Sequence, residues 1–142
     1  MASHQDNLGF LITDVARLMR RTFAARLQGS ALTLAQARAL IHVARHEGVR
    51  QVELAEFLEV QPITLARLLD QLGDAGLVER RPDPDDRRAY RIYLKPAAAP
   101  RLAAIEAVGA SIRADGLRNL NRQESALVMS TLRKMRDNLS PR

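Results

Sequence analysis

Apolar residues recur with the spacing of an α-helix along much of the chain, most clearly in residues 62–75. Leucines at Leu65, Leu68, Leu69 and Leu72 fall on one stripe. Pro62 favours the first turn of a helix, and Gly76 suits a left-handed cap after its last turn. We therefore predict a helix with one face in a core. Mostly polar and charged residues lie on its other side: Ile63, Thr64, Arg67, Asp70, Gln71 and Asp74.

A shorter apolar pattern precedes this helix in residues 51–59, formed by Val52, Leu54, Ala55 and Leu58. The few residues between the two stretches have the length of a helix-turn-helix corner. We expect the two stretches to form one such unit. Its second helix would then present a polar N-terminal half to a partner.

Two β-prone runs follow, residues 77–81 and 90–95, and the segment between them is rich in Pro, Asp and other turn formers. In the second run Tyr90, Ile92 and Leu94 are expected to point inward, while the residues between them point outward. The sequence thus predicts a two-stranded ribbon with arginines at its tip, which is a wing.

Two amphipathic helices are predicted before the helix-turn-helix unit. The first covers residues 6–28 and ends at Gly29, and its apolar stripe is Leu8, Leu11, Ile12, Val15, Leu18, Met19, Phe23 and Leu27. The second begins with a capping box of Thr33 and Gln36 and stops at Gly48. Its expected buried stripe is Leu34, Ala37, Leu40, Ile41 and Ala44.

Two more helices are predicted after the ribbon. Beyond a short link in residues 96–100, a long helix reaches about Leu120. Asn121 and Glu124 form a second predicted capping box, and the last helix has apolar positions at Val128, Leu132, Met135 and Leu139. The first and last helices are amphipathic and lie outside the winged unit. Pairing with a second copy of the chain is therefore expected to cover their apolar faces.

Composition narrows the classes of protein to consider. A chain of 142 residues with 46% hydrophobic and 27% charged residues fits one domain, residues 1–142. No stretch is long and apolar enough to span a membrane, and residues 1–11 lack a secretory signal pattern, so a cytoplasmic location is expected. The chain has no Cys, which excludes disulfides and thiolate metal sites.

The formal net charge of +6 favours a polyanion such as DNA as partner. Residues 30–77, however, carry more acidic than basic side chains, so the argument for DNA depends on where particular arginines point. His42 and His46 share one helix face at a spacing that metal sites use. Without a third ligand we interpret them as surface or pocket histidines, and no metal or cofactor is predicted.

These residues resemble the MarR family of winged helix-turn-helix transcription regulators. The wing sequence DPDDRRAYRIYL matches the family's Asp-x-Arg signature through Asp86 and Arg88, and ITLARLLDQLGDAGLVERR is similar to its recognition helix and following strand. The resemblance implies a mainly α fold with a small β-hairpin wing. A winged helix-turn-helix lobe in residues 33–95 would be flanked by dimerisation helices in residues 1–29 and 97–142.

The resemblance also implies a homodimer that binds a palindromic double-stranded DNA operator. The candidate contacts of the recognition helix are Gln61, Pro62, Ile63, Thr64 and Arg67. The strongest is Arg67, because a guanidinium can donate two hydrogen bonds to guanine O6 and N7. The alternative is that Arg67 pairs within its helix with Asp70 or Gln71.

In the wing, Arg87 and Arg88 are the candidate DNA contacts, and the resemblance places Arg88 in the minor groove with Asp86 bracing it. Asp70 would be repelled by phosphate, so it is expected, like Asp86, to orient an arginine. Arg80 and Arg81 are expected to meet phosphate or solvent rather than bases.

Family members commonly repress transcription and release DNA when a small aromatic or anionic effector enters a cleft beside the DNA-binding lobe. Arg17, Arg38 and His42 are the candidate residues for such a pocket. An enzyme is not predicted, because no nucleotide-binding glycine loop, nucleophile elbow or convincing metal set is present. The alternative function is a winged-helix module that binds protein partners without responding to an effector.

Overall fold

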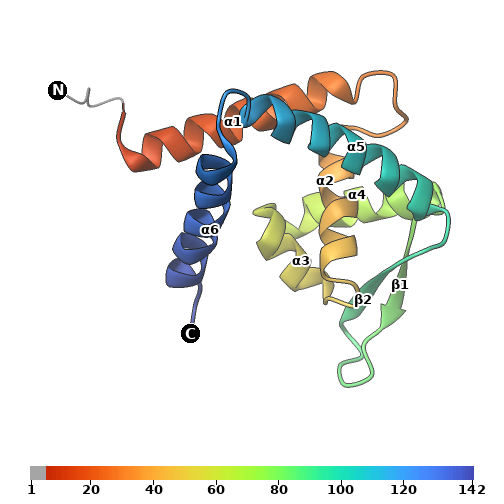
Figure 1. Ribbon diagram of the computed structural model, residues 1–142. Coiled ribbons are helices and arrows are strands. Elements are labelled where there is room, and N and C mark those ends of the chain that lie inside the picture. Colours follow the sequence, from red (N-terminus) through yellow and green to blue (C-terminus); the bar gives the residue numbers. More distant parts are fainter. Residues whose placement is uncertain (1–5) are drawn as a thin grey trace. The chain divides into compact units, whose positions relative to one another are not determined.

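The structure, a computed structural model, describes residues 6–142. This part of the chain contains six helices and two strands (Figure 1): α1 Leu8–Arg26, α2 Leu34–Arg45, α3 Gln51–Leu58, α4 Pro62–Asp74, β1 Val78–Pro82, β2 Tyr90–Leu94, α5 Ala98–Gly116 and α6 Arg122–Leu139. The predicted fold class, mainly α with a small β-hairpin, is confirmed. Two compact units form, one ending at Gly109 and the other running from Ala110 to Arg142. Residues 1–5 of the predicted N-terminal segment lie outside the described residues.

The core of the first unit is built around the leucine stripe of α4. Leu65, Leu69 and Leu72 are at most 1% exposed. They share a cluster with Leu40 of α2 and Ile92 of β2. Burying one such side chain contributes roughly 1.5 to 3 kcal/mol, so this cluster holds α4 firmly in the lobe.

The ends of the helices follow the local signals in the sequence. Both predicted capping boxes are confirmed: Thr33 Oγ1 accepts from the Gln36 backbone N–H at 3.2 Å, and Asn121 Oδ1 accepts from that of Glu124 at 2.8 Å. Gly76, with φ +75°, follows the last turn of α4 as predicted. A left-handed conformation there favours glycine because it has no Cβ.

The helix-turn-helix corner is short and hydrogen-bonded. α3 ends at Leu58, Glu59 adopts the left-handed conformation with φ 54°, and the Val60 backbone N–H donates to the Ala55 carbonyl at 3.1 Å. Pro62 then begins α4. The predicted corner between the two helices is therefore confirmed.

The wing is a two-stranded antiparallel ribbon in which Val78 pairs with Leu94 and Pro82 with Tyr90. The corner between α2 and α3 extends it. The Gly48 N–H donates to the Ile92 carbonyl at 2.8 Å, and the Ile92 N–H donates to the Val49 carbonyl at 2.9 Å. A Cβ at Gly48 would lie 3.4 Å from the Tyr93 hydroxyl, so this close approach suits glycine. These hydrogen bonds attach β2 to the corner between α2 and α3.

Several predicted details are wrong. Ala44 is exposed, whereas Ala39 and Val43 are buried, because α2 is covered from several sides, by α3, α4 and β2. The segment in residues 96–100 is not a plain link, since α5 already begins at Ala98. Pro100 fits the first turn of α5, where its missing N–H would have no intrahelical partner. The same helix ends at Gly116, before the predicted Leu120.

The apolar faces of α1 and α6 behave differently from those of the core. Neither helix contains a buried residue. The exposed apolar side chains of α1 are Leu8, Phe10, Leu11, Ile12, Val15, Leu18 and Met19, and those of α6 are Leu127, Val128, Met129, Leu132 and Leu139. No helix in the described part of the chain is long and apolar enough to cross a membrane.

Candidate nucleic-acid interface

The first two turns of α4 present the predicted contact residues to solvent. Gln61 is the N-cap of α4 and makes no side-chain cap hydrogen bond, and Pro62 occupies the first turn. Ile63 is 64% exposed, and Thr64 and Arg67 are exposed as well. The leucine stripe on the opposite side fixes this orientation, so the N-terminal end of α4 forms an outward-facing polar edge.

Arg67 does not pair with Asp70 or Gln71, the two intrahelical partners considered from the sequence. Asp70 Oδ1 instead accepts from Arg80 Nη1 of β1 at 2.7 Å, and Gln71 Oε1 accepts from Gln36 Nε2 of α2 at 2.8 Å. Within residues 6–142 no hydrogen bond or ion pair engages the guanidinium of Arg67. All five of its N–H donors are therefore available to an external acceptor.

Asp70 and Arg80 connect the ribbon to the recognition helix. Besides Asp70, Arg80 donates to the Ala66 carbonyl at 3.1 Å and, through Nε, to Gln51 Oε1 at 3.1 Å. The expectation that Asp70 orients an arginine agrees with this geometry. The Arg80 side chain keeps 31% of its surface exposed to solvent while these hydrogen bonds hold it between α3 and α4, and its contact with phosphate rather than bases stays a prediction.

The tip of the wing carries Arg87 and Arg88, both exposed. The turn is closed by the Ala89 N–H donating to the Asp86 carbonyl at 3.1 Å. Asp86 Oδ1 accepts from the Arg88 backbone N–H at 2.9 Å. Asp86 therefore shapes the backbone beneath Arg88, as aspartates do in Asx turns, and leaves the Arg88 guanidinium free to contact another molecule.

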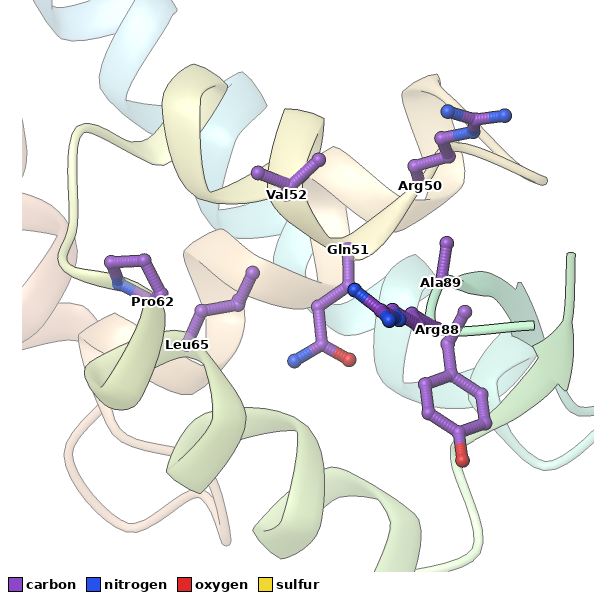
Figure 2. A pocket seen from close by; sticks show the side chains of 8 residues that line it. Arg50, Gln51, Val52, Pro62, Leu65, Arg88 and Ala89 are labelled. Carbon is purple, nitrogen blue, oxygen red and sulfur yellow. The ribbon is translucent and has the colours of Figure 1, made fainter. Parts of the chain in front are cut away.

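The wing and the recognition helix face a common pocket of about 340 Å³. Figure 2 shows Arg88 extending from the wing toward Gln51 of α3, with Pro62 and Leu65 of α4 on the other side. The N-terminal end of α4 and the wing arginine therefore border the same surface. A double helix lying on this surface could meet both elements at once.

Two expectations about the ribbon need correction. Tyr90 is 47% exposed rather than turned inward, because it pairs with Pro82 at the end of the ladder nearest the turn. Arg91, expected to point into solvent, is half-buried and donates through Nη1 to the Gly48 carbonyl at 3.0 Å. The corner between α2 and α3 covers the side of the ribbon that the alternation assigned to solvent.

Arg81 lies on the same face of the ribbon as Arg91, with which it is paired across the two strands. Its guanidinium pairs with Glu79 at 2.6 Å and stacks on the Tyr93 ring at 3.8 Å from the centroid. The side-chain hydrogen bond to Glu79 raises the pKa of Arg81. The Arg81 side chain is 54% exposed, so it meets solvent as expected while it also contacts Glu79 and Tyr93 within the ribbon.

The sequence reasoning missed a polar cluster around Asp83. This residue is 4% exposed, and its Oδ2 accepts from Arg50 Nε at 2.8 Å and from Arg91 Nε at 3.0 Å. The only sequence signal was an Asp at the start of an Arg-rich turn. That signal does not distinguish a buried carboxylate from an ordinary turn former.

The candidate effector residues lie on α1 and α2. Arg17 pairs with Asp14 at 3.6 Å, and both side chains are exposed. Arg38 and His42 are one turn apart on α2, and His42 Nδ1 is buried without a hydrogen-bond partner in the described residues. Partial burial lowers the pKa of His42, and the positive charges of Arg45 and Arg38 lower it further. The neutral imidazole is therefore favoured at neutral pH.

His46 lies one turn after His42 on the same helix face. Its ring stacks on Phe57 with 4.2 Å between centroids and lies 6.3 Å from the ring of His42. In the part of the chain that is described, no group of three or more His, Cys, Asp or Glu side chains is arranged to hold a metal ion.

The arrangement of helix-turn-helix, exposed helix N-terminus and arginine-tipped wing is that of a winged helix-turn-helix transcription regulator. The MarR family model matches residues 32–90, from two residues before α2 to the first residue of β2. A crystal structure of transcriptional regulator PA3341 is 40% identical, with 94% of this chain and 98% of that chain covered and a TM-score of 0.80. The chain belongs to the MarR family.

Two structures of MarR from E. coli are also similar. The wild-type apo form is 28% identical, with 94% of this chain and 98% of that chain covered and a TM-score of 0.81. A mutant of the same protein in complex with operator DNA is 30% identical, with 90% and 92% covered and a TM-score of 0.72. This chain is therefore a MarR-family transcription regulator with a DNA-binding winged helix.

Proposed function

We propose that this protein is a homodimeric repressor that binds a palindromic operator and is released by a small aromatic or anionic effector. The observation that carries the proposal is the common surface of α4 and the wing. On it, Arg67 has no partner among residues 6–142, and Arg88 borders the same pocket as Pro62. In the proposed complex, Arg67 reads a guanine in the major groove while Arg88 enters the adjacent minor groove.

Further DNA contacts are assigned to the edges of the same surface. Thr64 contacts a base through its hydroxyl or methyl group, and Ile63 contacts a thymine methyl. Gln61 pairs with adenine beside Pro62. Arg87 binds phosphate next to the minor groove. Asp70 and Asp86 do not touch DNA, because each already accepts a hydrogen bond within the lobe.

The exposed apolar faces of α1 and α6 support the proposal of a homodimer. Val15 is 54% exposed and Leu132 is 46% exposed, and each belongs to a stripe of similar side chains. Extended apolar patches of this kind mark interaction surfaces. A twofold dimer would place two copies of α4 about 34 Å apart on one face of the duplex, which explains why the operator should be palindromic.

The proposed effector site lies near Arg17, Arg38 and His42. Arg38 supplies positive charge for an anionic group, the unpartnered Nδ1 of His42 one turn away on α2 supplies a polar atom, and Arg17 of α1 is the further candidate cation. An effector releases DNA only if it binds more tightly to a conformation whose two recognition helices do not match the operator. Thermal-shift screening of phenolic acids should reveal a stabilising ligand. The same ligand should then displace the operator at similar concentrations.

The experiment that tests the proposed function is selection of bound sequences from a random duplex library, carried out with the purified full chain. We expect one enriched motif with two inverted half-sites whose centres are about one helical turn apart. A motif without inverted symmetry would reject the dimeric operator. The absence of any enriched motif would reject sequence-specific binding and favour a role in binding protein partners.

A further inference from the structure

Asp83 is the one charged residue buried in the part of the chain that the structure describes. Its side chain has no exposed surface. A buried carboxylate is unfavourable unless it is paired and hydrogen-bonded. Here both oxygens are used: Oδ1 accepts from the Asp85 backbone N–H at 2.8 Å, and Oδ2 accepts from Arg50 Nε and Arg91 Nε at 2.8 and 3.0 Å.

The three residues of this cluster belong to different parts of the lobe. Asp83 opens the wing turn, and its backbone N–H donates to the Ala89 carbonyl at 3.0 Å to close that turn. Arg91 lies on β2, whereas Arg50 is the N-cap of α3. Arg50 and Arg91 also form an isolated antiparallel β-bridge. One carboxylate therefore joins the tip of the wing to the start of the helix-turn-helix unit.

Hydrogen bonds keep this carboxylate charged. The Asp85 backbone N–H, followed by the Arg50 guanidinium, holds the pKa of Asp83 below its usual value of 3.8, although burial acts in the opposite direction. Asp83 is therefore ionised at neutral pH. Because its side chain is shielded from water, salt screens its two ion pairs less than it screens a pair on the surface.

The Asp70–Arg80 ion pair also connects the wing to the helices, but it is exposed to solvent. Asp70, which pairs with Arg80, has a side chain that is 62% exposed. This pair joins α4 to Arg80 in β1, which lies three residues before Asp83. The hydrogen bonds of Gly48 and Val49 with Ile92 likewise hold the middle of β2. Among the contacts of the described residues 6–142, the Asp83 cluster is the one that ties the end of the ribbon carrying Arg87 and Arg88 to the helices.

We propose that Asp83 is a positioning residue for DNA recognition, which sets the distance between the wing tip and α4 through its contacts with Arg50 and Arg91. The inference rests on the proposed function, in which Arg88 and Arg67 enter neighbouring grooves. Asp83 is buried and does not touch DNA itself. Without its charge the ribbon still pairs, but the turn is no longer held against α3, and Arg88 no longer arrives in the minor groove in register with Arg67.

A double-mutant cycle tests this inference, because it measures whether two residues act together. The variants are D83N, R88A and R67A, with both double variants, and operator affinity is measured by fluorescence anisotropy at fixed salt. Asn retains an oxygen for the Asp85 N–H but not the charge that holds two arginines. D74N is the matched control, since Asp74 is exposed in the same lobe and the change in net charge is the same.

We expect D83N to weaken operator binding by about tenfold, the size of one good charged contact, and D74N to leave it nearly unchanged. Adding R88A to D83N should have much less effect than R88A has in the wild-type chain. Adding R67A should weaken binding by the same factor in both backgrounds. Hydroxyl-radical protection of the minor groove should be lost in D83N, while protection of guanine N7 in the major groove persists.

Additive effects of D83N and R88A would overturn the positioning role while leaving the proposed wing contact intact. If R88A alone binds as the wild type does, the wing contact itself is wrong, and the positioning role falls with it. Circular dichroism and thermal unfolding establish that each variant is folded. Should D83N fail to fold, R50Q removes one of the two arginines, and a smaller coupling with R88A of the same sign is expected.

Discussion

The winged-helix lobe and the helices α1 and α6 differ in what covers their apolar side chains. In the lobe, Leu40, Leu54 and Leu65 have no exposed surface. On α1 and α6 no residue is buried, and Leu139 is 83% exposed. Both regions nevertheless show the same helical spacing of apolar residues. The spacing thus reports which face of a helix is apolar, but not what packs against it.

The ion pairs of the two regions also differ. In the lobe the charged side chains of Asp83, Arg91 and Arg80 are tied to other elements and fix the wing relative to the helices. On α6 the one ion pair that is described joins neighbouring residues, Arg136 and Asp137. The lobe is therefore complete within one copy of the chain, whereas α1 and α6 present surfaces suited to a second copy.

The largest expected effect concerns the core of the lobe. Leu69→Ala should lower the free energy of unfolding by roughly 2 to 5 kcal/mol, because it removes buried contacts and leaves a cavity. Leu139→Ala, at a nearly fully exposed position, should change it by less than about 0.5 kcal/mol. Urea unfolding followed by circular dichroism measures both. Equal losses at the two positions would contradict the division between the regions.

The apolar faces of α1 and α6 should control association instead of folding. Val15→Glu and Leu132→Glu each place a charge in the proposed dimer interface, so the dimer dissociation constant should rise on the order of 100-fold, equivalent to about 2.7 kcal/mol. Ala126→Glu introduces the same charge at an exposed position on the opposite side of α6 and should have little effect. Sedimentation velocity at several concentrations measures the change. Dimers as stable as the wild type in all three variants would exclude these faces from the interface.

A change at the exposed edge of α4 should leave both folding and association intact. Arg67→Ala should weaken operator binding by about 1 to 3 kcal/mol and relax base preference at one position in each half-site. Arg101→Ala, an exposed arginine on α5, removes the same charge and serves as the control. Gel-shift titrations with the wild-type operator and single-base variants make the measurement. Unchanged affinity and base preference in the Arg67 variant would reject the contact.

The smallest expected effect is the pH dependence of the contribution that Asp83 makes to the free energy of unfolding. The pKa of Asp83 is lowered by folding, so its contribution to stability is present above the unfolded pKa and is lost as pH falls through the folded pKa. Near pH 6, D83N should therefore melt at a lower temperature than the wild type, and the difference should shrink below about pH 4. D137N, which removes a surface ion pair on α6, should show no such difference.

Much of the fold follows from signals within short stretches of the sequence. The capping boxes at Thr33 and Asn121, the start of α4 at Pro62 and the glycine after its last turn each depend on a few neighbouring residues. The buried face of α2 was not fully predicted. It depends on the other elements that pack around it, and helical spacing alone does not reveal their positions.

The candidate site divides in the same way. The outward face of α4 and the arginines of the wing could be predicted, because the leucine stripe and the turn residues determine which side chains are left for a partner. The cluster of Arg50, Asp83 and Arg91 could not. Arg50 lies 33 residues before Asp83, and alternation along β2 assigned Arg91 to solvent. Only the approach of the corner between α2 and α3 to the ribbon brings them together.

The central claim is that two copies of the lobe bind one duplex through α4 and the wing, joined by the apolar faces outside the lobe. Native mass spectrometry of the chain with its selected operator tests this most directly, using a duplex with one half-site scrambled as the comparison. Two chains on the intact duplex and a marked loss of that complex on the altered duplex are predicted. A single bound chain, or equal binding to both duplexes, would contradict the claim.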